Sequence, residues 1–166
     1  MSISSDVLGE MKDAGIDFVT SVPCILLAEL LELLDKEPSM THLPVTREEE
    51  GMGVCAGAYL AGKTPAMLMQ NSGLGNSINA LASLVLYYDI PLVLIFSHRG
   101  TEGEKINAQV PMGDATPKLL DAVGIEYITI ESAENMGKIR DAIKKANSES
   151  KPVAVLLPFS FWGERQ

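Results

Sequence analysis

Residues 65–97 read PAMLMQNSGLGNSINALASLVLYYDIPLVLIFS, and this stretch decides the fold. It begins with an apolar run at 65–71, passes through a glycine-containing turn, follows a helical period to about residue 87, and ends in a second apolar run at 91–97. Apolar runs without polar alternation are typical of parallel strands that are buried on both faces. The stretch therefore predicts a strand–helix–strand unit with parallel strands.

The same alternation extends along the whole chain. Further strands are expected at 17–22, 41–46, 126–130 and 152–157, and further helices near the N-terminus and at 24–37, 48–61, 116–123 and 132–147. Because crossover connections between parallel strands are right-handed, the pattern predicts a doubly wound, open α/β fold: a mostly parallel six-stranded sheet with helices on both faces. No repeat, linker or low-complexity tract divides residues 1–166, so we expect a single domain.

The composition excludes several classes of protein. The chain has 166 residues, 46% of them hydrophobic, and a net charge of -9, which argues against nucleic-acid binding. No apolar run reaches the roughly 18 residues of a membrane span, and the N-terminus lacks a signal-peptide pattern. The two cysteines, Cys24 and Cys55, form no disulfide framework and are interpreted as core residues. We therefore expect a cytoplasmic protein without membrane contact, which can still bind a small anion.

Ligands in an open α/β sheet bind beyond the carboxyl ends of the strands. Four segments that follow expected strands carry polar or glycine residues: 21–23 (SVP), 46–48 (TRE), 70–76 (QNSGLGN) and 97–100 (SHRG). We expect these segments to line the binding site.

The segment 70–76 is the most informative of the four. Two glycines between a strand and a helix let backbone amides approach a ligand, and the helix N-terminus favours polar or anionic groups. The segment matches neither the dinucleotide-binding fingerprint nor a Walker loop. Two interpretations stay open: a ligand-binding loop, or a tight turn capped by Ser72 and Asn76.

Three consecutive carboxylates, Glu48, Glu49 and Glu50, begin the helix that follows the second strand. The helix dipole favours acidic residues in the first turn, and this explains most such runs. Successive helical residues point about 100° apart, so the three side chains have different surroundings. One of them could therefore be held away from water beside small residues such as Gly51.

A polar stretch without a period, 98–111, begins with His98 and Arg99. An arginine at a strand end is a forked donor that suits a carboxylate, a sulfonate or a phosphonate, whereas a lone histidine is more often structural. A loop of this length in a compact domain is usually a functional lid or is ordered by a partner. No set of His, Cys and carboxylate residues has metal-ligand spacing, so we expect no metal ligands in this chain.

Two segments closely resemble the pyrimidine-binding half of thiamine-diphosphate decarboxylases. They are residues 47–84 (REEEGMGVCAGAYLAGKTPAMLMQNSGLGNSINALASL) and residues 90–100 (IPLVLIFSHRG). Residues 18–27 (FVTSVPCILL) and 151–158 (KPVAVLLP) also fit, so the resemblance covers nearly the whole chain. Within that family the sequence is most similar to the alpha subunits of sulfopyruvate decarboxylases, followed by phosphonopyruvate decarboxylases.

The resemblance implies roles for particular residues. In the family, a glutamate hydrogen-bonds N1′ of the aminopyrimidine of thiamine diphosphate and so activates the cofactor. Family spacing implies that Glu48 is this catalytic acid, with Glu49 as the second choice. The loop that faces the cofactor would contain Asn71, Ser72, Gly73 and Asn76.

The resemblance also implies a substrate site. Arg99, with His98 beside it, would hold the sulfonate or carboxylate of a small anionic 2-oxo acid, and Pro23 falls on a family loop near the substrate. The implied reaction is the decarboxylation of 3-sulfopyruvate to sulfoacetaldehyde and CO2, as in coenzyme M biosynthesis by methanogenic archaea.

One feature of the family is missing from this sequence. The family binds the diphosphate and its Mg2+ through Gly-Asp-Gly and a later Asn, and the near match Gly113-Asp114-Ala115 lacks the second glycine. The resemblance therefore implies a hetero-oligomer in which a beta subunit carries the diphosphate-binding domain and the Mg2+, with the active site shared between the two chains.

Two alternatives stay open. The same half-enzyme could act on phosphonopyruvate or another 2-oxo acid, because one arginine cannot distinguish a sulfonate from a phosphonate. The chain could also be a non-catalytic assembly or regulatory subunit with the same fold. Retention of Glu48 and Arg99 argues against the latter, since a scaffold needs neither.

Overall fold

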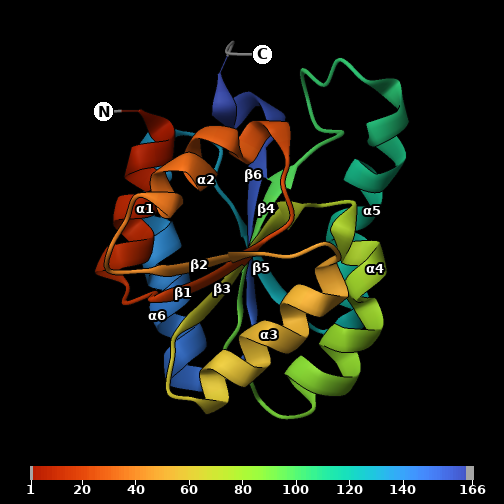
Figure 1. The fold of residues 1–166 in the computed structure, drawn as a ribbon. Helices are drawn as coiled ribbons and strands as arrows, with labels where there is room; N and C mark the ends of the chain where they lie inside the picture. The colour runs from red at the N-terminus through yellow and green to blue at the C-terminus, as the bar shows by residue number, and fades with distance from the viewer. Residues whose placement is uncertain (1, 164–166) are drawn as a thin grey trace.

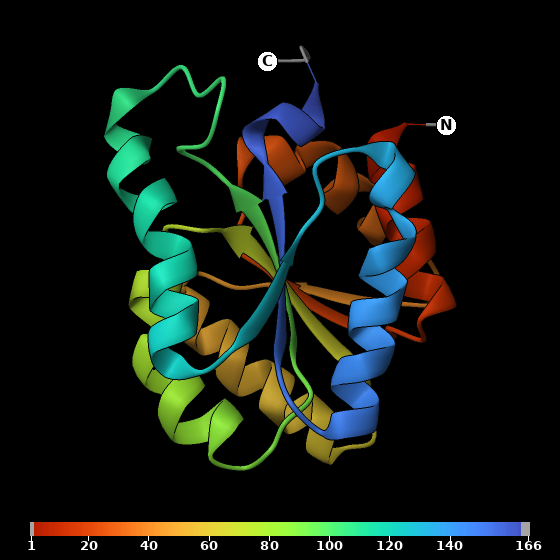
Figure 2. The same ribbon diagram turned by 180° about the vertical axis from the view of Figure 1, so that it is seen from behind.

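The computed structural model describes residues 2–163 and contains one parallel sheet between two layers of helices (Figures 1 and 2). The strands are β1 (Phe18–Ser21), β2 (Thr41–Pro44), β3 (Pro65–Gln70), β4 (Val93–His98), β5 (Glu126–Thr129) and β6 (Val153–Pro158). The α-helices are α1 (Ile3–Asp13), α2 (Ala28–Asp35), α3 (Glu48–Leu60), α4 (Gly73–Ala80), α5 (Val110–Val123) and α6 (Gly137–Glu149). Shorter helices are η1 (Ile25–Leu27), η2 (Leu81–Leu86), η3 (Asn107–Gln109), η4 (Ala133–Asn135) and η5 (Phe159–Trp162). Within residues 2–163, no helix is both long and apolar enough to cross a membrane.

The six strands run in the order β2-β1-β3-β4-β6-β5, and every neighbouring pair is parallel. Helices α1, α2 and α6 cover one face, and α3, α4 and α5 cover the other (Figure 1). Alternate residues of β4 face the two layers: Val93 and Ile95 pack in the first core, Leu94 and Phe96 in the second. The predicted doubly wound α/β fold is confirmed.

The topology places a switch point at the carboxyl ends of β1 and β3. These strands are neighbours, but the chain leaves β1 towards α2 on one face and leaves β3 towards α4 on the other. Ligands in open α/β sheets bind at such a switch point. The segments that follow β1, β2, β3 and β4 therefore meet at this edge, as the sequence predicts.

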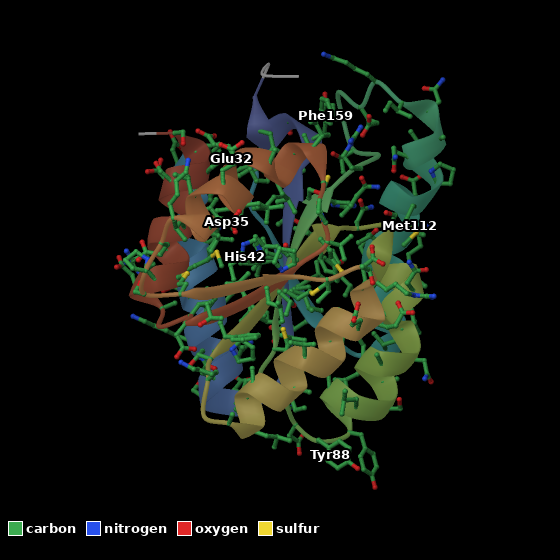
Figure 3. The ribbon with its side chains drawn as sticks, viewed as in Figure 1. Glu32, Asp35, His42, Tyr88, Met112 and Phe159 are labelled. Atoms are coloured by element: carbon green, nitrogen blue, oxygen red, sulfur yellow. The ribbon has the colours of Figure 1, made fainter. Side chains whose placement is uncertain are left out.

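The side chain of His42 connects β2 to α2. Figure 3 shows it beside Asp35. One ring nitrogen lies 2.7 Å from Oδ1 of Asp35, and the other lies 2.8 Å from the hydroxyl of Ser21. The three side chains share the connectivity of a hydrolytic triad. Ser21 is fully buried, however, so its hydroxyl cannot reach a substrate, and the arrangement is structural.

Helix α5 differs most from the sequence prediction. It begins at Val110 rather than Thr116, and η3 precedes it directly, so the irregular stretch ends near Ile106 rather than Pro111. Pro111 stands in the first turn, where a helix needs no N–H donor, and Pro117 stands inside the helix. The other predicted elements are confirmed with shifted ends; the helix after β3 continues beyond Ala80 as the π-helix η2.

Candidate active site

The three carboxylates at the start of α3 point in different directions. Glu50 turns back, and its Oε2 accepts hydrogen bonds from the backbone N–H (3.2 Å) and the hydroxyl (3.0 Å) of Thr46. Glu49 pairs with the Nε of Arg47 at 2.6 Å. The other oxygen of Glu49, Oε2, is buried without a hydrogen-bond partner in the described part of the chain. Glu50 thus bonds back to the residue before the N-cap of α3, and Glu49 turns towards Arg47.

Glu48 is half-buried and turns towards the start of α4, which lies beside α3 (Figure 1). The Nδ2 group of Asn76 donates a hydrogen bond to its Oε2 at 2.9 Å. The carboxylate lies against Gly73: a Cβ atom at that position would stand 2.6 Å from Oε1 and 2.7 Å from the carboxyl carbon. The structure therefore brings together Glu48, Gly73 and Asn76.

Asn71 and Ser72 have different surroundings from each other. Asn71 is 1% exposed, and its side-chain oxygen accepts from the backbone N–H of Arg99 at 2.9 Å. Its Nδ2 donates to the carbonyl of Arg99 (3.2 Å) and to the hydroxyl of Thr116 (2.9 Å). Asn71 thus positions the loop after β4 and does not point outwards. Ser72 is exposed; its hydroxyl makes no capping bond and accepts from Nε2 of Gln70 at 2.9 Å.

Arg99 is held by Glu104 within the loop that follows β4. The two side chains are 7% and 1% exposed. Arg99 donates through Nε to Oε2 at 2.6 Å and through Nη2 to Oε1 at 2.7 Å. This bond is the main cause that lowers the pKa of Glu104 to about 2 and raises the pKa of Arg99. The guanidinium carbon lies 5.5 Å from the ring centroid of Phe159, which Figure 3 shows beyond the ends of β4 and β6.

His98 replaces a missing backbone hydrogen bond of α5. Pro117 has no N–H with which to reach the carbonyl of Gly113, four residues earlier, and Nε2 of His98 donates to that carbonyl at 3.0 Å. Nδ1 is then the unprotonated nitrogen, and among residues 2–163 it has no partner. Burial lowers the pKa of His98, so the ring is neutral at pH 7.

A hollow of about 390 Å³ lies beside His98. Glu102 and Glu131 line it, which makes it a poor site for an anion. Arg99, by contrast, interacts with Cys24 in the connection after β1. His98 therefore contributes to the site through the position of α5.

Pro23 is exposed and lines a hollow of about 340 Å³ together with Cys24 and Ile25. The thiol of Cys24 accepts from the hydroxyl of Ser97 at 3.1 Å and interacts with Arg99. Cys24 packs partly against the core, as expected, but its sulfur belongs to this polar cluster at the strand ends. Its position directly after Pro23, beyond the end of β1, is the signal that could have identified it. Cys55 is buried, as predicted.

The family model described as "Thiamine pyrophosphate enzyme, N-terminal TPP binding domain" matches residues 1–122. The chain belongs to this family. Sulfopyruvate decarboxylase subunit alpha of Methanothermobacter thermautotrophicus is 55% identical over 163 residues, which are 96% of this chain and 97% of that protein. Sulfopyruvate decarboxylase of Methanosarcina acetivorans is 40% identical over 156 residues, which are 94% of this chain and 40% of that protein.

A solved structure of an oxidoreductase shares the fold. The 2-oxoglutarate:ferredoxin oxidoreductase from Magnetococcus marinus matches 96% of this chain and 29% of its own, with a TM-score of 0.74 and 15% sequence identity. At this identity the likeness concerns the fold alone.

The residues at the start of α3 and α4 fit the pyrimidine part of thiamine pyrophosphate (thiamine diphosphate). A carboxyl group can share a proton with a ring nitrogen, and Asn76 holds the Glu48 carboxylate at the mouth of the site. Gly73 leaves the space that this carboxylate occupies. Within residues 2–163, no group of three or more His, Cys, Asp and Glu side chains comes together to hold a metal ion.

Proposed function

We propose that this chain is the alpha subunit of a sulfopyruvate decarboxylase, which converts 3-sulfopyruvate to sulfoacetaldehyde and CO2 in coenzyme M biosynthesis in the cytoplasm. The observation that carries the proposal is the carboxylate of Glu48, placed over Gly73 and bound by Asn76 at the switch-point edge of the sheet. The 55% identity to a sulfopyruvate decarboxylase alpha subunit over nearly the full length of both chains supports the substrate.

Thiamine diphosphate, when bound, supplies the electron sink that a 2-oxo acid needs to lose CO2. Glu48 would hold the aminopyrimidine through a hydrogen bond to its N1′ atom, and Asn76 keeps the carboxylate oriented. The exposed hydroxyl of Ser72 and the backbone at Gly73 would lie beside the ring. Glu49, which pairs with Arg47, is the alternative acid.

The substrate lies between the ends of β1 and β4. Arg99 receives its sulfonate or carboxylate, and Pro23 borders it from the connection after β1. Asn71 contributes by fixing the backbone of Arg99, and His98 by holding the start of α5 beside it.

A beta subunit completes the active site in a hetero-oligomer and supplies the diphosphate-binding domain and the Mg2+. Residues 1–166 then form one pyrimidine-binding domain. This proposal is supported by the relative from M. acetivorans, in which the match to this chain occupies only 40% of the protein. The near match Gly113-Asp114-Ala115 lies inside α5, where Gly113 packs against the backbone of Gly100.

The three adjacent glutamates provide a test with matched controls. The chain is reconstituted with its beta subunit, thiamine diphosphate and Mg2+, and CO2 release from 3-sulfopyruvate is measured for Glu48→Gln, Glu49→Gln and Glu50→Gln. We expect Glu48→Gln to lower kcat by about 100-fold or more, and the other two to stay within about threefold of the wild type. Gel filtration should show that all three still assemble.

The outcomes separate the alternatives. Loss of activity in Glu49→Gln instead would move the catalytic role by one residue. A wild-type complex that decarboxylates phosphonopyruvate faster than 3-sulfopyruvate would change the substrate, since the two differ only in their anionic group. A complex that releases CO2 from neither would leave a non-catalytic subunit.

A further inference from the structure

Glu104 occupies one edge of the Arg99 guanidinium, and the side chain of Arg99 also interacts with the thiol of Cys24. An arginine can bind an oxyanion in a fork either side-on, through Nε and Nη2, or end-on, through Nη1 and Nη2. Glu104 takes the side-on edge with bonds of 2.6 and 2.7 Å. The hydrogens of Nη1 and the second hydrogen of Nη2 are not used by this bond.

Glu104 is itself fixed, so an incoming anion does not displace it. Its carboxylate also accepts from three backbone N–H groups, those of Gly100 (3.1 Å), Lys105 (2.9 Å) and Ile106 (3.0 Å). The side chain is 1% exposed. Its departure would break all of these bonds at once and leave a buried arginine without its counter-charge, which is unfavourable.

Arg99 is held on its other sides as well. Asn71 bonds both the N–H and the carbonyl of its backbone, and the ring of Phe159 lies against the guanidinium. The remaining interaction is with Cys24, which belongs to the connection after β1. This interaction places one side of the guanidinium towards the connection after β1, next to the switch point at the ends of β1 and β3, where the substrate is placed in the proposed function.

We propose that Glu104 is a positioning residue for the substrate: it holds Arg99 side-on so that the end-on edge receives the acid group of the substrate. This inference rests on the proposed function for the class of substrate. Because the Arg99–Glu104 pair is neutral as a whole, the anion is bound by two directed hydrogen bonds more than by net charge.

The test measures anion binding separately from turnover, in the reconstituted complex. The probe is 3-sulfopropionate, which carries both acid groups of sulfopyruvate but lacks the 2-oxo group and cannot react. We expect Glu104→Gln to raise the Kd for this probe and the KM for 3-sulfopyruvate about tenfold or more, because the amide keeps one bond to Arg99 at most. The kcat should change by less than about threefold, and the Kd for thiamine diphosphate should not change.

Glu102→Gln is the matched control, since Glu102 is an exposed glutamate of the same loop. It should leave every one of these quantities unchanged. An unchanged or lower Kd for 3-sulfopropionate in Glu104→Gln would overturn the proposal, because Glu104 would then be irrelevant to the anion or compete with it.

A double-mutant cycle separates positioning from general damage to the loop. Lys at position 99 keeps the charge but has no fork, so Arg99→Lys should weaken probe binding, and adding Glu104→Gln should weaken it little further. An equal further loss would mean that Glu104 acts only on folding, and overturns the proposal. If Glu104→Gln does not assemble, Glu104→Asp replaces it, and wild-type probe binding in that variant would also overturn the proposal.

The experiments can refute the proposed function and the positioning role of Glu104 independently of each other. A wild-type complex that binds 3-sulfopropionate through Arg99 and releases no CO2 from 3-sulfopyruvate would refute the reaction and keep the positioning role. A complex that decarboxylates 3-sulfopyruvate normally after Arg99→Lys would refute the positioning role and keep the reaction.

Discussion

At the scale of single residues, the absence of a side chain at Gly73 leaves the space in which the carboxylate of Glu48 lies. A methyl group at position 73 would overlap the carboxylate, so Gly73→Ala has to push Glu48 away from Asn76. Gly75 lies two residues further along α4 with open space where its Cβ would be. An alanine should therefore disturb the Glu48 site at position 73 and leave it intact at position 75.

We expect Gly73→Ala to weaken thiamine diphosphate binding and to lower kcat by about tenfold or more, because a displaced carboxylate no longer meets the pyrimidine. Gly75→Ala should keep both values and stabilise the helix by about 0.5–1 kcal/mol. Calorimetric titration of the cofactor and kinetics of the complex measure both effects. Equal behaviour of the two variants would mean that Glu48 does not touch the cofactor.

The residue scale also shows where sequence reasoning stops. The family resemblance implies that Asn71 faces the cofactor, but its amide is turned inwards because Arg99 and Thr116 offer it buried partners. The pairing of Arg99 with Glu104 was not predicted, since a loop without a period gives no spacing from which to infer contacts. Side-chain direction in such loops depends on tertiary partners.

At the scale of elements, α5 illustrates the same limit. Two prolines break its helical pattern, so the sequence predicts a helix only from Thr116. The helix starts at Val110 because Pro111 needs no donor there, and because His98 satisfies the carbonyl that Pro117 leaves open. The compensating donor, His98, lies on β4, so a window of sequence around α5 does not contain it. The buried strands β3 and β4 were predicted because their apolar runs carry the signal themselves.

This compensation gives a testable coupling. His98→Leu removes the donor and leaves the Gly113 carbonyl unpaired, so we expect the free energy of unfolding to fall by about 1–3 kcal/mol. In a Pro117→Ala background the new backbone N–H can reach that carbonyl. His98→Leu should then lower the free energy of unfolding by clearly less. Urea unfolding of the four chains measures the coupling. Equal costs in both backgrounds would show that the hydrogen bond contributes little.

The pH dependence provides an independent readout of the same residue. Burial lowers the pKa of His98 in the folded chain, so between that pKa and 6.5 the unfolded chain binds more protons at this position. The contribution of His98 to stability is therefore complete above pH 6.5 and decreases as the pH falls below it. The wild type should lose more stability between pH 7.5 and 5.5 than His98→Leu does.

At the scale of the whole molecule, the charges are unevenly distributed. From Gly51 to Tyr88 the sequence contains a single charged residue, Lys63, although 21% of the chain is charged. This stretch includes α3 after its first three residues, all of α4, and η2. It also contains three exposed large apolar or aromatic side chains, those of Leu60, Tyr87 and Tyr88. Figure 3 shows Tyr88 at the opposite end of the molecule from Phe159. Helices that carry so few charges and lie next to the Glu48 site suit an interface with the proposed beta subunit, because interface cores are depleted in charge.

Two asparagines make this assignment testable. Asn79 is exposed on α4, and Asn147 is exposed on α6, on the other face of the sheet. Each change to Asp adds one negative charge and hardly alters the shape. We expect Asn79→Asp to weaken assembly with the beta subunit by about tenfold or more, because burying an unpaired charge is costly, and Asn147→Asp to leave it unchanged. Sedimentation across a concentration series measures both. The isolated chains should unfold alike, since both sites face solvent there, and weaker assembly in Asn147→Asp alone would place the partner on the opposite layer.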